Sequence, residues 1–239
     1  MPRNNPYTLE ICVENPDTLT ACAATADRVE LCSALDIGGL TPSIGLMEQS
    51  KASGVETHVL IRPHGGDFTM SPTELATAVA DIRAAKAMEL KGVVIGAERA
   101  GALDRRALDA MVHAADGMDI TLHRVIDVLD DPVAAIEVAI EYAMVRILTS
   151  GAAMSAAHGI AGLKRLHTSA AGRIDIMAGA GINSGNIRTI MDQTAITSFH
   201  ASCSAKARLD QRYVQFGFGD ATRTFDPHEM ARLAQVLKS

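Results

Sequence analysis

Eight short apolar runs alternate with longer amphipathic stretches along the chain, and this alternation constrains the fold more than any other feature. The short runs have the length of buried β-strands, and the stretches between them have the length of helices. A β-then-α unit that repeats eight times without an obvious linker predicts an α/β fold, in which a parallel sheet closes into a (β/α)8, or TIM, barrel. An open doubly wound sheet is the competing arrangement, which the number of units disfavours. We expect strands at residues 9–13, 29–32, 58–61, 92–96, 120–123, 145–149, 174–177 and 197–200.

The helical stretches carry starting signals of their own. Ser71 is followed three residues later by Glu74, which fits a capping box, and Asp131 and Asp226 each precede a proline suited to the first helical turn. We also expect a helix that starts at Pro42, after a glycine-rich turn. These signals place helices between the strands and one final helix near the end of the chain.

The composition fits one large domain. The chain has 239 residues, of which 48% are hydrophobic and only 3% aromatic, so its core must consist mainly of aliphatic side chains, alanine and methionine. Barrels of this length are commonly single domains. We therefore expect one domain over residues 1–239, with the barrel at about 7–203 and an irregular tail with a final helix at 204–239.

Charge and hydropathy exclude several classes of partner. The net charge is −6 and no basic cluster stands out, which argues against nucleic-acid binding. No apolar segment is long enough to span a bilayer, and "MPRNNPYTLE" has no secretory signal, so we expect a cytoplasmic protein without a membrane partner. Four cysteines in such a compartment do not indicate a disulfide framework.

The first two strands end in similar patterns, Glu-x-Cys. Glu10 stands two residues before Cys12, and Glu30 two residues before Cys32. Residues two apart in a strand share a face, so each carboxylate lies on the same side as its thiol. If those sides face the barrel lumen, two carboxylates lie one layer beneath two thiols.

The carboxylates allow two interpretations. Buried carboxylates need partners, and the nearest candidates are Arg62 and Arg124 at the ends of strands three and five. The pair could form a purely structural layer of ion pairs. It could instead perform acid–base chemistry with His123 and His200, or with Asp127.

The thiols allow three interpretations. Neighbouring strands could bring Cys12 and Cys32 together as soft ligands for Cu(I) or zinc. They could equally be small core residues, as we expect for Cys22. A disulfide between adjacent strands is a third, smaller possibility.

A third group of residues is suited to bind an anion. "MAGAGIN" after strand seven is a glycine-rich turn that opens a helix, and in barrel enzymes the loops after strands seven and eight often bind phosphate. Such a turn is weak evidence by itself, because any βα turn can require glycine. The candidate anion-binding residues are Arg62, Arg124, Ser150, Gly151, Gly179, Gly181 and Ser202.

Several motifs resemble those of one known family. "ADRVELCSALDIGGLTPSIGL", "HVLIRPHGGDF", "TLHRVID", "RILTSG" and "IMAGAGI" are similar, in order from about Leu9 to Ser202, to the CutC family of copper homeostasis proteins. The resemblance implies a TIM barrel, a cytoplasmic location and a homo-oligomer, either dimer or tetramer. It also implies copper, as Cu(I), bound through Cys12 and Cys32. Cys203, close to His200, stands where the family usually has alanine, and it is a further candidate ligand specific to this chain.

Two functions therefore stay open. The first is a copper homeostasis protein that buffers or delivers Cu(I) through thiols at the carboxyl-terminal mouth of the barrel, and the resemblance favours it. The second is a barrel enzyme that acts on a small anionic or phosphorylated substrate. Its acid–base residues would be Glu10, Glu30, His123 and Asp127, because a copper buffer has no need for a mouth lined with charged residues.

Overall fold

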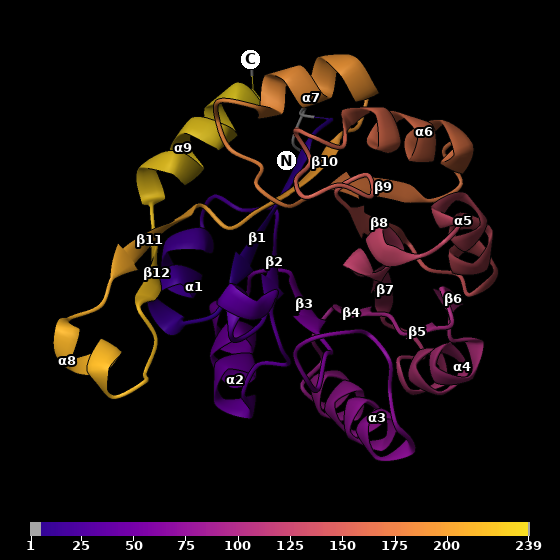
Figure 1. Ribbon diagram of the computed structural model, residues 1–239, viewed down its shortest axis with the longest axis horizontal. Helices are drawn as coiled ribbons and strands as arrows, with labels where there is room; N and C mark the ends of the chain where they lie inside the picture. The colour runs from indigo at the N-terminus through magenta and orange to yellow at the C-terminus, as the bar shows by residue number, and fades with distance from the viewer. Residues whose placement is uncertain (1–5, 239) are drawn as a thin grey trace.

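The computed structural model describes residues 6–238. Within them, eight parallel strands close into a barrel in the order β1–β2–β3–β4–β7–β8–β9–β10 and back to β1, which Figure 1 shows nearly end-on. The predicted TIM barrel is confirmed, and each strand lies within one residue of its expected ends. The strands are β1 Thr8–Val13, β2 Arg28–Leu31, β3 Thr57–Leu60, β4 Gly92–Ile95, β7 Asp119–Leu122, β8 Arg146–Thr149, β9 Asp175–Ala178 and β10 Ser198–Ala201.

Helices surround the barrel and begin largely where their caps predict. Ser71 forms the capping box with Glu74, while Asp131 and Asp226 accept hydrogen bonds from the first turns of their helices. The helix expected from Pro42 begins instead at Ile44, because the Ser43 side chain accepts from the Leu46 N–H and acts as the cap. The outer helices are α1 Pro16–Cys22, α2 Ile44–Ser53, α3 Pro72–Ala87, α4 Arg105–Ala114, α5 Pro132–Glu141, α6 Ile160–Ala170, α7 Ile187–Thr194 and α9 Pro227–Val236.

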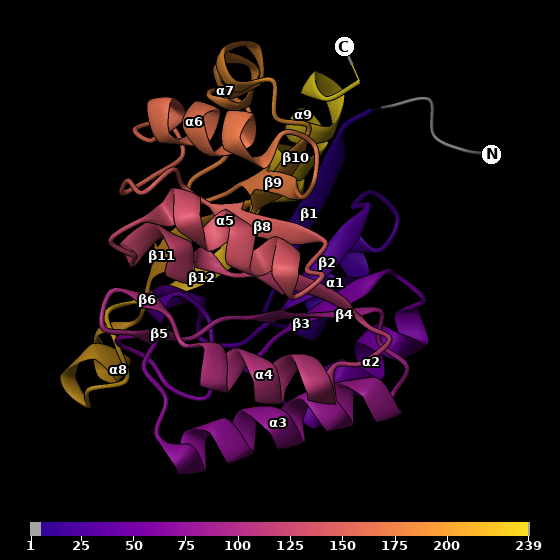
Figure 2. The same ribbon diagram turned by 90° about the vertical axis from the view of Figure 1, so that its right-hand side faces the viewer.

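Shorter elements gather at one end of the barrel. Figure 2 shows the hairpin of β5 (Glu98–Arg99) and β6 (Ala102–Leu103) at the same end as a second hairpin, formed by β11 (Ser204–Arg208) and β12 (Ala221–Phe225). Two 3-10 turns, η1 (Leu35–Ile37) and η2 (Arg124–Val128), follow β2 and β7 at their carboxyl ends. These elements surround the mouth of the barrel.

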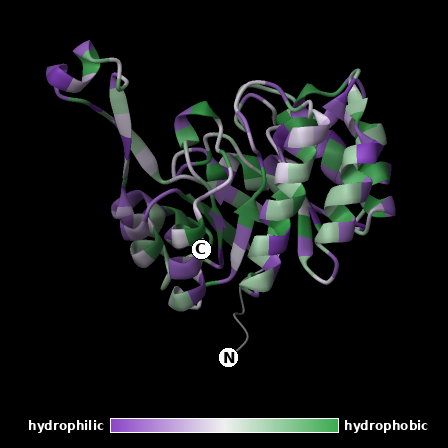
Figure 3. Ribbon diagram, turned by 90° about the horizontal axis from the view of Figure 1, so that it is seen from below, coloured by the Kyte–Doolittle hydropathy of each residue, from purple (hydrophilic) through white to green (hydrophobic). Residues whose placement is uncertain are grey.

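The carboxyl-terminal segment is more regular than expected. Its antiparallel hairpin β11–β12 carries α8 (Gln211–Gln215) at the tip, which stands away from the barrel in Figure 3. The chain then returns as α9, which packs against α7 and completes the helical layer. No helix within residues 6–238 is both long and apolar enough to cross a membrane.

Side chains alternate between the two faces of each strand, so the barrel has two separate interiors: the layer between sheet and helices, and the lumen. Leu9, Ile11 and Val13 of β1 belong to the large apolar core between the sheet and the helices. Cys12 belongs to a separate small cluster, with Cys32, Leu60 and Val94, because the opposite face of each strand points into the lumen. The helix–sheet layer is therefore aliphatic, whereas the lumen is free to hold polar side chains.

Candidate functional site

A cavity of about 470 Å³ opens at the mouth of the barrel, at the carboxyl ends of the strands, where this fold carries its ligand sites. Strand ends and the loops that follow them both contribute to its wall. Its polar and charged members are Glu30, Arg62, His123, Arg124, Asp127, His200, Ser202 and Arg223, and its larger apolar members are Leu35, Ile37, Leu60, Phe68, Val128 and Leu148.

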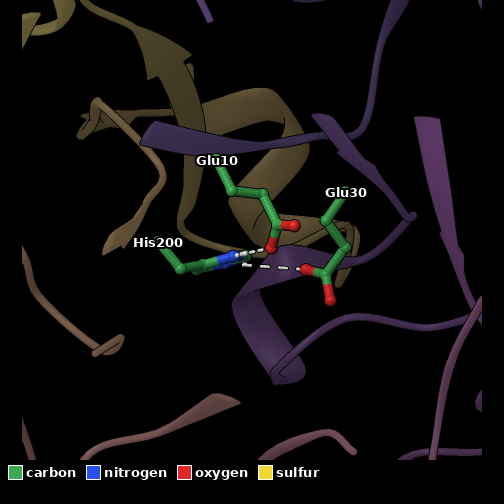
Figure 4. A group of neighbouring side chains, drawn as sticks. All are labelled: Glu10, Glu30 and His200. Carbon is green, nitrogen blue, oxygen red and sulfur yellow. Dashed lines mark hydrogen bonds and ion pairs between the residues drawn. The ribbon is translucent and has the colours of Figure 1, made fainter. Parts of the chain in front are cut away.

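Two carboxylates and an imidazole form a buried cluster at this end of the barrel. Figure 4 shows the ring of His200, from β10, directed towards both Glu10 and Glu30. Its Nδ1 lies 2.7 Å from Glu10 Oε1 and its Nε2 lies 3.6 Å from Glu30 Oε2. Glu10 is fully buried and Glu30 is 5% exposed. Both glutamates point inward, which is the condition that the acid–base hypothesis required.

The buried charge of Glu10 is balanced by Arg28, whose Nε–H donates to Glu10 Oε2. The expectation that Arg62 or Arg124 would pair with these glutamates was wrong. The register explains why, since Glu10 lies directly beside Arg28 in the β1–β2 ladder. Arg28 begins its strand and stands two residues before Glu30, so the shared face could have indicated it.

The three members of the cluster have pKa values shifted in different directions. Burial alone would raise the pKa of Glu10, but Arg28 and His200 outweigh it and hold that pKa far below its usual range. Burial raises the pKa of Glu30 to about 7, with His200 opposing and Glu10 adding to the shift. The pKa of His200 is well above its usual value despite burial, because Glu30, Cys12 and Glu10 surround it. Near neutral pH Glu10 is thus a carboxylate and His200 an imidazolium, while Glu30 is divided between its protonated and ionised forms.

Asp127 has its oxygens fully engaged. They accept hydrogen bonds from Arg124 Nε at 2.8 Å, from Thr149 Oγ1 at 2.5 Å, from the N–H and hydroxyl of Ser150 and from the Ala152 N–H. A carboxylate with this many donors stabilises the loop after β8 and orients Arg124. This geometry favours a positioning role for Asp127 over proton transfer.

The candidate anion-binding residues divide into two groups. Arg62, Arg124, Gly181 and Ser202 line the cavity. The N–H of Gly151 donates to Thr149 Oγ1 and that of Gly179 to the Thr149 carbonyl, so neither is available to a ligand. Ser150 contacts the cavity indirectly, because its hydroxyl accepts from Arg124 Nη2 at 3.0 Å.

Comparison with known proteins fits this architecture. The family model of the CutC family matches residues 7–205. The chain belongs to the CutC family. A CutC family protein of Agrobacterium fabrum is 46% identical over 238 residues, covering 98% of this chain and 95% of the relative, and one of Sinorhizobium medicae is 46% identical over 222 residues, covering 92% and 91%.

One solved structure resembles this chain in both sequence and fold, and a second resembles it in fold alone. The crystal structure of CutC from Streptococcus agalactiae has a TM-score of 0.78 and 30% identity, and covers 82% of this chain and 98% of that one. The N-(5′-phosphoribosyl)anthranilate isomerase of Pyrococcus furiosus has a TM-score of 0.59 at 12% identity, over 97% of this chain and 98% of that one. The second likeness shows the shared barrel fold alone.

In this CutC barrel the cysteines occupy two different environments. Cys12 and Cys32 lie in the same lumen cluster, and Cys12 also reaches the cavity wall. Their thiols donate to the carbonyls of Ala201 and Val13 at 3.7 Å and 3.5 Å. Cys22 and Cys203 belong instead to the core between sheet and helices. The structure therefore brings the predicted pair together and leaves Cys203 outside the lumen cluster.

A second set of metal-ligand atoms exists in the lumen. Ligand atoms of Glu10, Glu30 and His200 all lie within 4.8 Å of one another. However, Arg28 already neutralises Glu10, and the imidazolium of His200 faces both carboxylates. A cation bound there would have to displace the His200 proton, so the charge balance favours a proton-transfer cluster over a metal site.

Two cavity residues escaped the sequence analysis. Phe68 contacts both Arg62 and His123 through its ring. Arg223 comes from β12, and its Nε lies 3.0 Å from Asp36 Oδ1 in η1. The second pair is 187 positions apart in the chain, and the pattern around Arg223 indicates no link to the mouth.

Proposed function

We propose that this CutC-family chain is an enzyme that performs acid–base chemistry on a small anionic substrate, such as a phosphorylated one. The observation that carries the proposal is Glu30, a buried carboxyl group on the cavity wall whose pKa is raised to about 7. A group of this kind can accept and return a proton at neutral pH, which is what a general base requires.

The surroundings of Glu30 support chemistry over a structural role. A structural ion pair is complete in Arg28 and Glu10, whose side chains contact directly. Glu30 instead faces Nε2 of His200, which lies 3.6 Å from its carboxylate and belongs to a ring already paired with Glu10. Without a closer cation, burial of an ionised Glu30 costs free energy. Strongly shifted carboxyl groups beside a cavity are typical of functional sites.

Two arginines at the mouth suit an anionic group of the substrate. The Arg124 side chain is 42% exposed, and its orientation is held by Asp127 and Ser150. Arg223 reaches the cavity wall from the hairpin and is oriented by Asp36. Guanidinium groups held in this way bind carboxylate or phosphate with defined geometry. Gly181 and Ser202 lie on the same wall, in the loops after β9 and β10.

The test is proton exchange from carbon acids. The full chain is incubated in deuterated buffer with a set of phosphorylated sugars and small hydroxy- and oxo-acids, and deuterium incorporation is measured by mass spectrometry. We expect incorporation into at least one compound, and a loss of about a hundredfold or more in Glu30→Gln. Glu137→Gln, an exposed glutamate paired with Arg173, is the matched control and should keep wild-type exchange. Equal exchange in Glu30→Gln and wild type would overturn the proposal.

Cu(I) binding is the second candidate, and one observation favours it. Cys12 and Cys32 lie in one lumen cluster, and the negative groups that raise the pKa of Cys32 after burial, namely Cys12, Glu30 and Glu14, would also stabilise a cation. Two thiolates are the ligands that Cu(I) prefers. The relative from Streptococcus agalactiae is named for copper homeostasis. In this role the ion would be cargo that the protein buffers or delivers in the cytoplasm.

Anaerobic competition against a Cu(I) chelator tests the second candidate. Tight one-to-one binding should collapse in Cys12→Ser/Cys32→Ser and persist in Cys22→Ala, because Cys22 lies outside the lumen. Cys203→Ala should also keep its affinity, since Cys203 shares the core of Cys22. Weak binding that the double substitution leaves unchanged would make both lumen thiols packing residues.

We also propose that the chain works as a homo-oligomer. Tyr213, Phe216 and Phe218, in and beside α8, are 50%, 73% and 74% exposed on a hairpin that stands away from the barrel. Large exposed aromatic side chains on a projecting arm are typical of protein interfaces. Light scattering of Phe216→Ser/Phe218→Ser against wild type tests this proposal, which predicts a smaller assembly for the variant. An unchanged mass would remove the arm from any interface.

A further inference from the structure

His123, which lines the cavity, has a buried ring nitrogen without a hydrogen-bond partner among the described residues. The residue follows β7 directly, is 4% exposed and lines the cavity wall. Its Nδ1 accepts a hydrogen bond from the Val125 N–H at 3.1 Å. An imidazole nitrogen that accepts from a backbone N–H carries no proton, so the proton of the neutral ring is on Nε2. This Nε2 is buried, and no described residue accepts from it.

Gly96 gives the His123 ring the space for this orientation. Gly96 follows β4, and a Cβ at this position would lie 2.6 Å from Cε1 and 2.8 Å from Nδ1 of the ring. Any larger residue would displace the imidazole, because side-chain carbon atoms do not approach so closely. Since β4 lies between β3 and β7, the absent side chain leaves His123 space across the end of β4.

Arg62 provides a second donor of the same kind on the same wall. Its Nη1 donates to the carbonyls of Ile37 and Gly39, and its Nη2 to the carbonyl of Gly66, each at 2.9 Å. These three bonds fix the plane of the guanidinium group. The remaining Nε is buried without a partner among the described residues, although the side chain lines the cavity.

Phe68 links the two donors. Its ring centroid lies 4.9 Å from that of the His123 ring and 5.0 Å from Arg62 Cζ. The aromatic ring excludes water from part of both polar groups. An N–H without a partner therefore costs more free energy there, and a hydrogen bond from that N–H to a ligand is stronger. Two rigid, dehydrated donors on one cavity wall are suited to an oxygen atom that gains negative charge during a reaction.

We propose that His123 Nε2–H and Arg62 Nε–H donate together to a carbonyl oxygen of the substrate, and that Glu30 removes a proton from the carbon beside that carbonyl. The substrate class is then a small carbonyl compound with an anionic group, such as a phosphorylated hydroxy-ketone, hydroxy-aldehyde or oxo-acid. This inference rests on the proposed acid–base function and names its substrate class.

The step balances without an oxidant or a further reactant. Glu30 takes the proton, the C–H electron pair forms the carbon–carbon double bond of an enolate, and the carbonyl π-electrons move to the oxygen that the two donors face. The proton then returns from the Glu30 carboxyl group to the same carbon, which gives exchange with solvent. In a hydroxy-carbonyl compound it can return instead to the former carbonyl carbon, and isomerisation follows when the hydroxyl proton passes to the enolate oxygen and the hydroxyl carbon becomes the new carbonyl. His123 suits the role of neutral donor, because burial and the nearby Arg62 lower its pKa to about 3 and it stays uncharged.

His58 shows that an unpartnered buried histidine is not sufficient for this role. Its two ring nitrogens also have no hydrogen-bond partner among the described residues. However, His58 is absent from the cavity wall and lies near Glu56, which precedes its own strand, and near Asp119 at the start of β7. Of these residues, His123 and Arg62 line the cavity and His58 does not.

The experiment uses two probes that mimic a planar enediolate, glycolohydroxamate and phosphoglycolohydroxamate, titrated calorimetrically into the full chain. We expect the wild type to bind at least one, His123→Phe to bind it about tenfold or more weakly, and His123→Gln to recover part of the affinity through its amide N–H. His64→Gln, on the loop after β3 but outside the cavity wall, is the control and should bind like wild type.

Nitrogen-15 NMR of labelled histidines gives a readout that does not depend on the variants folding. The His123 side chain should keep the Nε2–H tautomer between about pH 5 and pH 9, and its Nε2–H resonance should shift when the probe binds. Titration of His123 within that range, an Nδ1–H tautomer, no probe binding up to roughly 10 mM, or equal affinity in His123→Phe would overturn the donor pair.

The two proposals can fail separately. Deuterium exchange that requires Glu30, together with probe affinity that ignores His123, keeps the acid–base function and removes the donor pair. Probe binding that requires His123, without deuterium exchange into any compound, keeps the donor pair as a ligand site and removes the reaction.

Discussion

His200 contacts Glu10 and Glu30 unequally, with Nδ1 2.7 Å from the first carboxylate and Nε2 3.6 Å from the second. The closer carboxylate also accepts from Arg28 and stays ionised, whereas the more distant one lacks a cation of its own and has its pKa raised to about 7. Burial of Glu30 and the pairing of Glu10 with Arg28 therefore separate two chemically identical groups into a proton acceptor and a fixed charge.

This asymmetry predicts the pH dependence of any reaction at the mouth. A general base acts in its deprotonated form, so the rate should rise with pH through about 7 and then level off. Glu30→Asp should keep this profile with a lower rate, because its shorter side chain moves the carboxylate away from the substrate. Rates of proton exchange measured across the pH range check this prediction. A profile without an inflection near 7 would assign the base to another residue.

The pair of Arg28 and Glu10 should be strongly coupled in stability. Removing one partner leaves a buried charge uncompensated, so Arg28→Leu should lower the free energy of unfolding by about 3–5 kcal/mol. The double variant Arg28→Leu/Glu10→Leu should lose less than the sum of the two single variants. Urea unfolding of all four proteins gives the coupling energy. Additive losses would contradict a direct interaction.

Asp127 should stabilise the mouth without taking part in proton transfer. Asp127→Asn replaces an oxygen that accepts backbone and side-chain donors with an NH2 group, so it should lower the free energy of unfolding by about 1–3 kcal/mol. Because Arg124 loses its anchor, weaker binding of an anionic substrate should accompany this change. KM should therefore rise more than kcat falls, and the pH profile should keep its inflection. A shifted inflection would give Asp127 a role in the chemistry.

The sequence was sufficient for the parts of the site that lie on single strands. Period-two alternation placed Glu10 and Cys12 on one shared face of β1, and the strand count predicted the barrel; that this face points into the lumen is a finding of the structure. It could not supply the relation between strands. Arg28 is the partner of Glu10 through the register of the β1–β2 ladder, and Arg223 reaches the mouth only because the β11–β12 hairpin folds back over η1.

Hydrogen-bond geometry is a further limit of the sequence analysis. The pattern "TLHRVID" indicates a histidine at a strand end, but the role of His123 depends on the Val125 N–H and on the space at Gly96. Asp127 in the same motif looks equally suited to proton transfer, although it accepts hydrogen bonds from the following β8 loop. Residue type gave the candidates, and only their contacts separate the roles.

His58 should make the protein sensitive to acid. Burial lowers its folded-state pKa to about 3, below its ordinary value of 6.5, so the unfolded chain binds more protons between these values. Stability should therefore fall as the pH decreases from about 6.5 towards 3, and this residue contributes up to about 5 kcal/mol of the loss. His123 contributes in the same direction, with a folded-state pKa of about 3. Glu30 acts in the opposite direction, because its raised pKa stabilises the folded state below neutral pH.

The difference between wild type and His58→Leu isolates the contribution of His58. The variant has no group to protonate at this position, so its stability relative to wild type should increase as the pH falls from 6.5, and should be constant above that value. Urea unfolding at a series of pH values measures the difference. A difference that does not change with pH would mean that His58 takes up a proton in the folded protein, in contact with Glu56 or Asp119, which lie 3.9 Å from its Nε2.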